Sequence, residues 1–242
     1  MKLVIIRHGD PNYEIDSLTP TGWKEAELLS HRVSKWDVKA FYSSPLGRAR
    51  DTAKPTLEKM GREAIVMDWL REFPLHIVKE GDPDSDCCWD WLPADWTKKA
   101  HFYDREAWMD DPVFSSVGAR AAYRYVTDGL DELLAKHGYR REGGYYRVTE
   151  ANEDTVVLFC HFGLQCVLLS HLLGVSPMVL WHGLCAAPTS VTTIYTEERR
   201  KGIASFRMAA FGDTSHLYVE GENPSFSARF CETYDNFDQR HD

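Results

Sequence analysis

The N-terminal residues carry the feature that most constrains this chain. Residues 3–6 are consecutive apolar residues, mostly β-branched, which predicts a buried strand, and this strand runs directly into Arg7, His8 and Gly9. The carboxyl end of a parallel strand is where ligand sites form. A neutral imidazole is a nucleophile near pH 7, a guanidinium binds phosphate oxygens, and a glycine lets the backbone approach a ligand. The tripeptide indicates phosphoryl chemistry through a phosphohistidine, with the alternative that a strand end merely happens to carry these residues.

The length and the composition favour one globular domain. The 242 residues suffice for one large core, and α/β chains of this length often form a single domain. No apolar run approaches the roughly 20 residues of a membrane span. The apolar run between Lys2 and Arg7 is too short for the apolar region of a signal peptide. We therefore expect a single domain over residues 1–242, with insertions, in the cytoplasm.

The charge and the cysteines narrow the expected partners. A formal net charge of -9 argues against nucleic acid or a membrane as the main partner, because an acidic surface repels polyanions. The cysteines include no C-x-x-C pair, which leaves little support for a zinc site or a disulfide framework. The histidines show no H-x-x-x-H or H-E-x-x-H spacing, and the segment after Cys160 lacks the arginine of a cysteine phosphatase loop. We expect reduced thiols and neither a metal nor a cofactor.

A second cationic motif follows a second predicted strand. An amphipathic pattern predicts a packing helix over residues 23–36, and residues 38–42 form a short predicted strand. This strand runs into Ser43-Ser44-Pro45-Leu46, where the proline favours the start of a helix, and Arg48 falls in the first turns of that helix. Arg48 is therefore close to another strand end and can bind an anion there.

These two motifs, in this order, resemble signature blocks of the histidine phosphatase superfamily in its phosphoglycerate-mutase-like branch. The matching residues are Arg7-His8-Gly9, and Ser43-Ser44-Pro45-Leu46 followed by Arg48. The resemblance implies an α/β fold, a three-layer α/β/α sandwich with a mostly parallel central sheet and an inserted cap segment. It makes residues 65–67 the third strand and puts Glu72 where the family has its acid. Considered without the resemblance, Glu72 is one surface carboxylate in an acidic chain.

A third motif resembles the part of the family that carries its second catalytic histidine. Residues 155–160 form the strongest predicted strand after the first and lead to His161, Phe162 and Gly163 at the start of an apolar helix. A histidine there can lie beside His8, and the amides of the helix start can face a phosphate. The family usually has a small residue after this histidine. Phe162 departs from that pattern, which affects the shape of the pocket wall more than the chemistry.

Two segments are interpreted as insertions, because the match to the family does not cover them. Residues 73–117 combine tryptophans with many carboxylates, and we expect them to form a cap of short helices and loops beside the site. This segment can be interpreted as a satellite hydrophobic cluster with a solvated acidic rim, or as a cap that contacts the substrate directly. The sequence supports both interpretations equally, and both can hold at once. Residues 139–148 flank a Gly-Gly pair with aromatic and charged residues, which predicts a hairpin insertion.

The remaining segments complete the predicted sheet and its cover. A long amphipathic helix is expected over residues 118–137, and two closing strands over residues 190–196 and 203–211. His216 follows these strands in a segment that also resembles the family. We retain His216 as a candidate pocket residue and expect most other histidines to be surface or core residues.

The resemblance assigns roles to the matched residues. His8 attacks phosphorus in line, and we expect a backbone carbonyl to hold its second ring N–H. Arg7, Arg48 and His161 stabilise the charge on the phosphoryl oxygens. Glu72 protonates the leaving oxygen and then activates water. The predicted phosphate-binding residues are Arg7, His8, Arg48, His161 and Phe162.

Hydrolysis of a small-molecule phosphomonoester, with inorganic phosphate as product, is the favoured activity. A mutase of this family has an asparagine six residues after the nucleophile and a basic pocket, whereas this chain has Glu14 there and more carboxylates at Asp10 and Asp16. The alternatives are a phosphoglycerate-mutase-type phosphotransferase and a catalytically silent binding module of the same fold. The intact core positions argue against the silent module, and a homodimer is left open.

Overall fold

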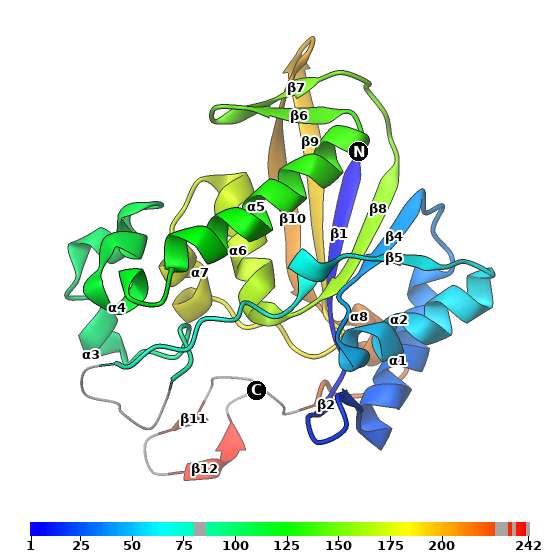
Figure 1. Cartoon of the computed structure of the whole chain (residues 1–242). Coiled ribbons are helices and arrows are strands. Elements are labelled where there is room, and N and C mark those ends of the chain that lie inside the picture. The colour runs from blue at the N-terminus through cyan, green and yellow to red at the C-terminus, as the bar shows by residue number, and fades with distance from the viewer. Residues whose placement is uncertain (80–85, 226–231, 234–235, 241–242) are drawn as a thin grey trace.

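The computed structural model describes residues 1–79, 86–225, 232–233 and 236–240, and one mixed β-sheet forms its centre (Figure 1). In spatial order the strands of this eight-stranded sheet are β5 (Ala64–Val66), β4 (Ala40–Ser43), β8 (Thr155–Cys160), β1 (Lys2–Arg7), β9 (Val191–Arg200), β10 (Ile203–Asp213), β7 (Tyr145–Val148) and β6 (Tyr139–Glu142). Neighbours from β5 to β1 pair in parallel, and neighbours from β1 to β6 pair antiparallel. The predicted α/β architecture is confirmed, with a parallel sheet core and antiparallel strands added on one side.

Helices cover both faces of the sheet: α5 (Ala119–Lys136) and α6 (Phe162–Leu173) on one face, α1 (Pro20–Val33) and α2 (Gly47–Met60) on the other (Figure 1). Side chains of β1 alternate between the two faces, because successive residues of a strand point in opposite directions. Leu3 and Ile5 belong to the larger buried core under α5 and α6, whereas Val4 and Ile6 belong to the smaller core under α1 and α2. Each such fully buried side chain stabilises the fold by about 1.5–3 kcal/mol.

The first helix lies earlier in the chain than the sequence pattern predicted. The Thr19 side chain accepts a hydrogen bond from the Gly22 amide at 3.1 Å, and Pro20 occupies the first helical position, so that α1 begins at Pro20. The helix ends at Val33, and Trp36 lies outside it with the Lys2 ammonium 4.2 Å from its ring centroid. The predicted span of 23–36 is therefore wrong at both ends. The prediction followed the spacing of apolar residues, which does not reveal the N-cap at Thr19.

Residues 86–117 form short helices around an aromatic cluster. These helices are α3 (Pro93–Trp96), η2 (Ala100–Tyr103), η3 (Ala107–Asp110) and α4 (Pro112–Ser115). Trp108 is fully buried, with ring centroids 5.5 Å from Trp181 of α7 (Pro177–Gly183) and 5.9 Å from Tyr123 of α5. Trp91 is also buried in this cluster, which is continuous with the larger core.

The remaining described elements are short. They are β2 (Pro11–Asn12), β3 (Ser17–Leu18), η1 (Asp68–Leu70), α8 (Ser215–Tyr218), β11 (Glu232–Thr233) and β12 (Asn236–Arg240). β2 and β3 pair as a small antiparallel ribbon directly after β1. Within the described residues, no helix combines the length and the apolar character that crossing a membrane requires.

Candidate active site

Three parallel strands deliver the candidate catalytic residues to one edge of the sheet. β1 ends at Arg7 and is followed by His8, β4 is followed by Ser44, and β8 is followed by His161. Because the carboxyl ends of parallel strands meet at the same edge, these residues converge. The rings of His8 and His161 lie 5.1 Å apart between centroids, and both side chains are buried.

His8 has one defined tautomer. Its Nδ1 lies 2.7 Å from the Gly9 carbonyl oxygen, which can only accept, so Nδ1 carries the proton and Nε2 keeps its lone pair. The expectation that a backbone carbonyl holds the second ring N–H is met by this contact. Burial, and next to it the charge of Arg7, holds the pKa of His8 well below its usual range. His8 is therefore a neutral imidazole with a free lone pair on Nε2.

His161 is held by a serine that the sequence analysis did not assign to it. Its Nε2 lies 2.8 Å from Ser44 Oγ, and the Leu46 amide donates a hydrogen bond to the same oxygen at 3.2 Å. Its Nδ1 is buried and has no hydrogen-bond partner in the described part of the chain. Burial, and then the proximity of His8, lowers the pKa of His161 well below its usual value. Ser44 belongs to the Ser43-Ser44-Pro45-Leu46 block that resembles the family, and this block was the available signal for its place in the site.

Two guanidinium groups flank the histidines. Arg7 is buried and donates from Nη1 to the Ala186 carbonyl. The Arg48 side chain is 11% exposed and donates from Nη1 to Asp16 Oδ1 at 2.6 Å. Arg48 Nε is buried with no hydrogen-bond partner among the residues that the structure describes. Both arginines are thus oriented by the protein, and Arg48 retains an unused donor.

Glu72 is half-buried beside the start of α6, and is not the exposed surface carboxylate that the residues alone suggested. Its Oε1 accepts hydrogen bonds from the amides of Phe73 and Leu164, each at 2.9 Å, and its Oε2 accepts one from Gly163 at 3.4 Å. Burial raises the pKa of Glu72, whereas these amides, Arg7 and Arg48 act in the opposite direction. A carboxyl group with a raised pKa therefore lies at the first turn of α6, directly after His161, where the charges of Arg7 and Arg48 act on it.

Trp89 reaches the site through a gap that Gly163 leaves open. A Cβ atom at residue 163 would lie 2.7 Å from Trp89 Cζ3 and 2.9 Å from Glu72 Oε1. The Phe162 side chain is buried in the larger core. Trp89 itself is only partly buried. The sequence analysis did not single out this contact.

Two further residues of the sequence analysis lie near His8. The Asp10 carboxylate accepts from Thr19 Oγ1 at 2.6 Å, which holds it on the ribbon after β1. His216 is buried and its Nε2 lies 3.1 Å from Thr189 Oγ1, while the Thr189 amide donates to the His8 carbonyl at 3.2 Å. His216 therefore supports the backbone behind His8.

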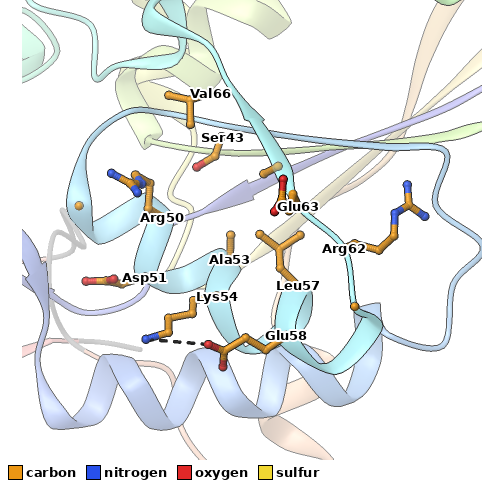
Figure 2. Close-up of a pocket in the computed structure, with 13 residues that line it drawn as sticks. Ser43, Arg50, Asp51, Ala53, Lys54, Leu57, Glu58, Arg62, Glu63 and Val66 are labelled. Atoms are coloured by element: carbon orange, nitrogen blue, oxygen red, sulfur yellow. Dashed lines mark ion pairs between the residues drawn. The ribbon is translucent and has the colours of Figure 1, made fainter.

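A separate pocket of about 680 Å³ lies between α2 and β5 (Figure 2). Its charged lining residues balance in sign, and they are Arg50, Asp51, Lys54, Glu58, Arg62 and Glu63. None of the candidate catalytic residues lines it, so cavity size does not mark the site here. In the described part of the chain, no group of three or more His, Cys, Asp or Glu residues is arranged to hold a metal ion.

The chain is similar to known proteins in sequence and in fold. The model of the histidine phosphatase superfamily (branch 1) matches residues 3–208. Phosphoserine phosphatase 1 of Hydrogenobacter thermophilus is 25% identical over 236 residues, which cover 91% of this chain and 97% of that protein. A probable phosphoglycerate mutase GpmB of Yersinia pestis is 24% identical over 227 residues, 90% of this chain and 95% of the relative. A mutant phosphoserine phosphatase of Entamoeba histolytica, solved with phosphoserine, shares the fold with a TM-score of 0.60 at 22% identity, covering 89% of this chain and 98% of that one.

The buried histidines predict a loss of stability in acid. The pKa values of His8 and His161 are lowered in the folded protein, so below the ordinary histidine pKa of about 6.5 the unfolded chain binds protons that the folded chain does not. The free energy of unfolding is therefore unaffected by these histidines above this pKa. As the pH falls below it, each histidine lowers the free energy of unfolding by up to about 1.4 kcal/mol per pH unit. Urea unfolding between about pH 7.5 and 5.5 measures this slope. His161→Gln should flatten it, the exposed His31→Gln should not, and equal slopes in both variants would contradict the expectation.

Proposed function

This chain belongs to the histidine phosphatase superfamily (branch 1), and from that membership we propose that it is a phosphomonoesterase that hydrolyses a small phosphorylated metabolite through a phosphohistidine on His8. The observation that carries the proposal is the state of His8. Its Nδ1 proton is held by the Gly9 carbonyl, its ring lies beside that of His161, and the charges of Arg7 and Arg48 act on it. A neutral nucleophile inside a cationic pocket suits attack on a phosphate monoester.

The proposed reaction has two steps. In the first, His8 Nε2 forms a bond to phosphorus while the bond from phosphorus to the ester oxygen breaks, and Glu72 gives its proton to that oxygen. In the second, the Glu72 carboxylate takes a proton from water, the hydroxide attacks phosphorus, and the bond to His8 breaks. Inorganic phosphate leaves and Glu72 is protonated again. Arg7 and Arg48 supply the positive charge, and together with His161 they supply the hydrogen bonds that stabilise the phosphoryl oxygens. The amides of Gly163 and Leu164 in α6 hold Glu72, and the amide of Phe162 at the start of this helix is the one that we assign to the phosphoryl group. No metal or cofactor takes part in the proposed reaction.

We favour hydrolysis over mutase chemistry, although the similar proteins include some named phosphatases and some named phosphoglycerate mutases. The ribbon after His8 carries Asp10, Glu14 and Asp16 and has no basic residue between positions 9 and 20. A phosphoglycerate would bring a second negative group to this acidic entrance, and like charges near a partly desolvated site are costly. A neutral remainder meets no such cost.

The arrangement of the chain around this site is part of the proposal. We propose one domain, with residues 73–117 as a cap beside the site and residues 139–148 as a hairpin insertion. The contact of Trp89 with the start of α6 supports the cap. We also propose that the enzyme acts in the cytoplasm on a small-molecule substrate, without nucleic acid or a membrane as partner.

The nucleophile and the cationic groups can be tested by substitution. His8→Ala should abolish hydrolysis of p-nitrophenyl phosphate while the protein stays folded, because a side chain at a strand end leaves no large cavity. Arg48→Ala and His161→Ala should each slow turnover by about 10²-fold or more, since each removes one preorganised charge-stabilising group. Steady-state rates with and without EDTA, together with melting curves, measure these effects. A substantial rate in His8→Ala would exclude His8 as nucleophile, and near-normal rates in the other two would exclude the phosphate clamp.

The role of Glu72 predicts a dependence on the leaving group and on pH. Glu72→Gln should impair alkyl phosphates strongly and p-nitrophenyl phosphate less, because a good leaving group needs little protonation. The acid must be protonated, so the rate on alkyl phosphates should fall as the pH rises through the Glu72 pKa, which burial moves above its ordinary value. This alkaline decline should be absent in Glu72→Gln. Equal losses on both substrates would indicate a structural role or another acid, with Asp10 as the next residue to test.

The structure also bears on the leaving group. Glu72 must contact the leaving oxygen, so the partly exposed ring of Trp89 next to Glu72 borders the remainder of the substrate. An indole face suits a ring or a cation. Among the carboxylates of the cap, the exposed Asp86 pairs with His76 at 2.7 Å, while Asp82 and Asp84 lie outside the described residues. We therefore propose a preference for monophosphates with a neutral, ring-bearing or cationic remainder.

A substrate panel tests this preference. We expect kcat/KM for a nucleoside monophosphate, a sugar monophosphate or phosphocholine to exceed that for 3-phosphoglycerate and fructose bisphosphate. Trp89→Ala should lower the preferred value by about 3- to 30-fold, the scale of one aromatic or cation contact. Trp96→Ala is the matched control, because Trp96 stacks on His182 instead. A clear lead for phosphoglycerate or the bisphosphate would contradict the proposed preference.

A further inference from the structure

We infer that Asp16, in the turn between β2 and β3, is a positioning residue that aims the Arg48 guanidinium at the phosphoryl group. The inference rests on the proposed function, because it concerns the group that Arg48 stabilises during hydrolysis. Asp16 Oδ1 accepts from Arg48 Nη1 at 2.6 Å, and Asp16 Oδ2 accepts from the Gly47 amide at 2.7 Å. One carboxylate therefore ties the guanidinium to the first turn of α2.

The contact leaves a different edge of the guanidinium for a ligand. Asp16 uses Nη1, whereas Arg48 Nε is buried and has no hydrogen-bond partner in the described part of the chain. A guanidinium has donors in a rigid planar fork, so fixing one terminal nitrogen fixes the direction of the others. With the carboxylate on Nη1, the Nε side of the fork is the one available to a phosphoryl oxygen.

The turn is shaped to bring this carboxylate to α2. Asp16 has a φ of 47°, in the left-handed region that side chains other than Asn and Asp rarely adopt. Its carbonyl oxygen lies 1.9 Å from the place of a Cβ at residue 47, so only Gly47 permits the approach. The neighbouring Ser17 Oγ donates to Asp51 on α2 at 2.5 Å. Both ends of the contact are thus built into the backbone.

Charge and orientation act in opposite directions at Asp16. Its carboxylate repels a phosphate group, which weakens binding, while its hydrogen bond to Arg48 fixes the donor that stabilises the transition state. A substitution that removes the charge and the alignment should therefore lower kcat without weakening phosphate binding. If Asp16 served only as a helix cap for the Gly47 amide, its substitution would change the stability of the protein and would leave kcat and phosphate binding unchanged.

The test is D16N, because asparagine tolerates the left-handed conformation of this turn. We expect kcat for p-nitrophenyl phosphate to fall at least about tenfold, as expected for a misaligned catalytic group. The factor should be the same for an alkyl phosphate, in contrast to Glu72→Gln, because the phosphoryl oxygens are common to both substrates. KM and the inhibition constant of inorganic phosphate should not rise. Asp16→Gly, which also accepts a positive φ, is the second variant if D16N does not fold.

The matched control is E14Q, which removes one negative charge from the same turn. Glu14 is exposed and its carboxylate makes no hydrogen bond within the described residues, so E14Q should keep the kcat of the unsubstituted protein. An unchanged kcat in D16N, a loss confined to KM, or an equal loss in E14Q would each overturn the inference.

A crystal structure of D16N with inorganic phosphate separates this inference from the proposed function. If Asp16 positions Arg48, the Arg48 guanidinium in D16N should leave the orientation that it has in the unsubstituted protein. An unmoved guanidinium would overturn it. This measurement needs no turnover, so an unsubstituted protein that fails to hydrolyse any phosphomonoester would refute the proposed function and leave the orientation of Arg48 to be judged separately.

Discussion

The parallel pairing of β1 with β8 is the interaction on which the candidate site depends. It aligns Arg7 with Cys160, so that the next residues of the two strands, His8 and His161, leave the sheet side by side. The pairing of β4 with β8 brings Ser44 to His161 in the same way. Because helices cover both faces of this part of the sheet, the two imidazoles are also buried, and burial lowers their pKa values. The fold therefore determines both the position of the histidines and their protonation state.

Burial makes the charged groups of the site dependent on fixed partners. An unpaired buried charge is costly, so each one is held by backbone groups or by an opposite charge. Arg7 donates to the Ala186 carbonyl, Glu72 accepts from amides at the start of α6, and Arg48 donates to Asp16. All of these partners belong to the chain itself, so the fold fixes the orientation of the groups. Such preorganisation is what makes charge stabilisation effective in a site from which water is largely excluded.

The parts of the site that could be predicted from the sequence are those set by local pattern. Strand periodicity and a helix start locate Arg7, His8, Arg48 and His161, because parallel strands carry their end residues to one edge. The interior position of Glu72 came from the resemblance and not from its own neighbourhood in the chain. The contacts of Asp16 with Arg48 and of Trp89 with Gly163 join segments whose relative placement no local pattern encodes. Glycines were the available signal, since Gly47 and Gly163 both stand where another segment approaches closely.

Acid strength and leaving-group fit depend on the same segment of the chain. In the proposed mechanism Glu72 gives a proton in one step and takes one in the next, which requires that neither form be strongly favoured. Burial favours the neutral acid, and Trp89 packs close to its carboxyl group, whereas the α6 amides and the arginines favour the carboxylate. A movement that carried Trp89 away would hydrate Glu72 and lower its pKa. The residue that borders the leaving group would therefore also set how much of Glu72 carries the proton, so that a substrate which seats Trp89 well also meets a larger protonated fraction of Glu72 at neutral pH.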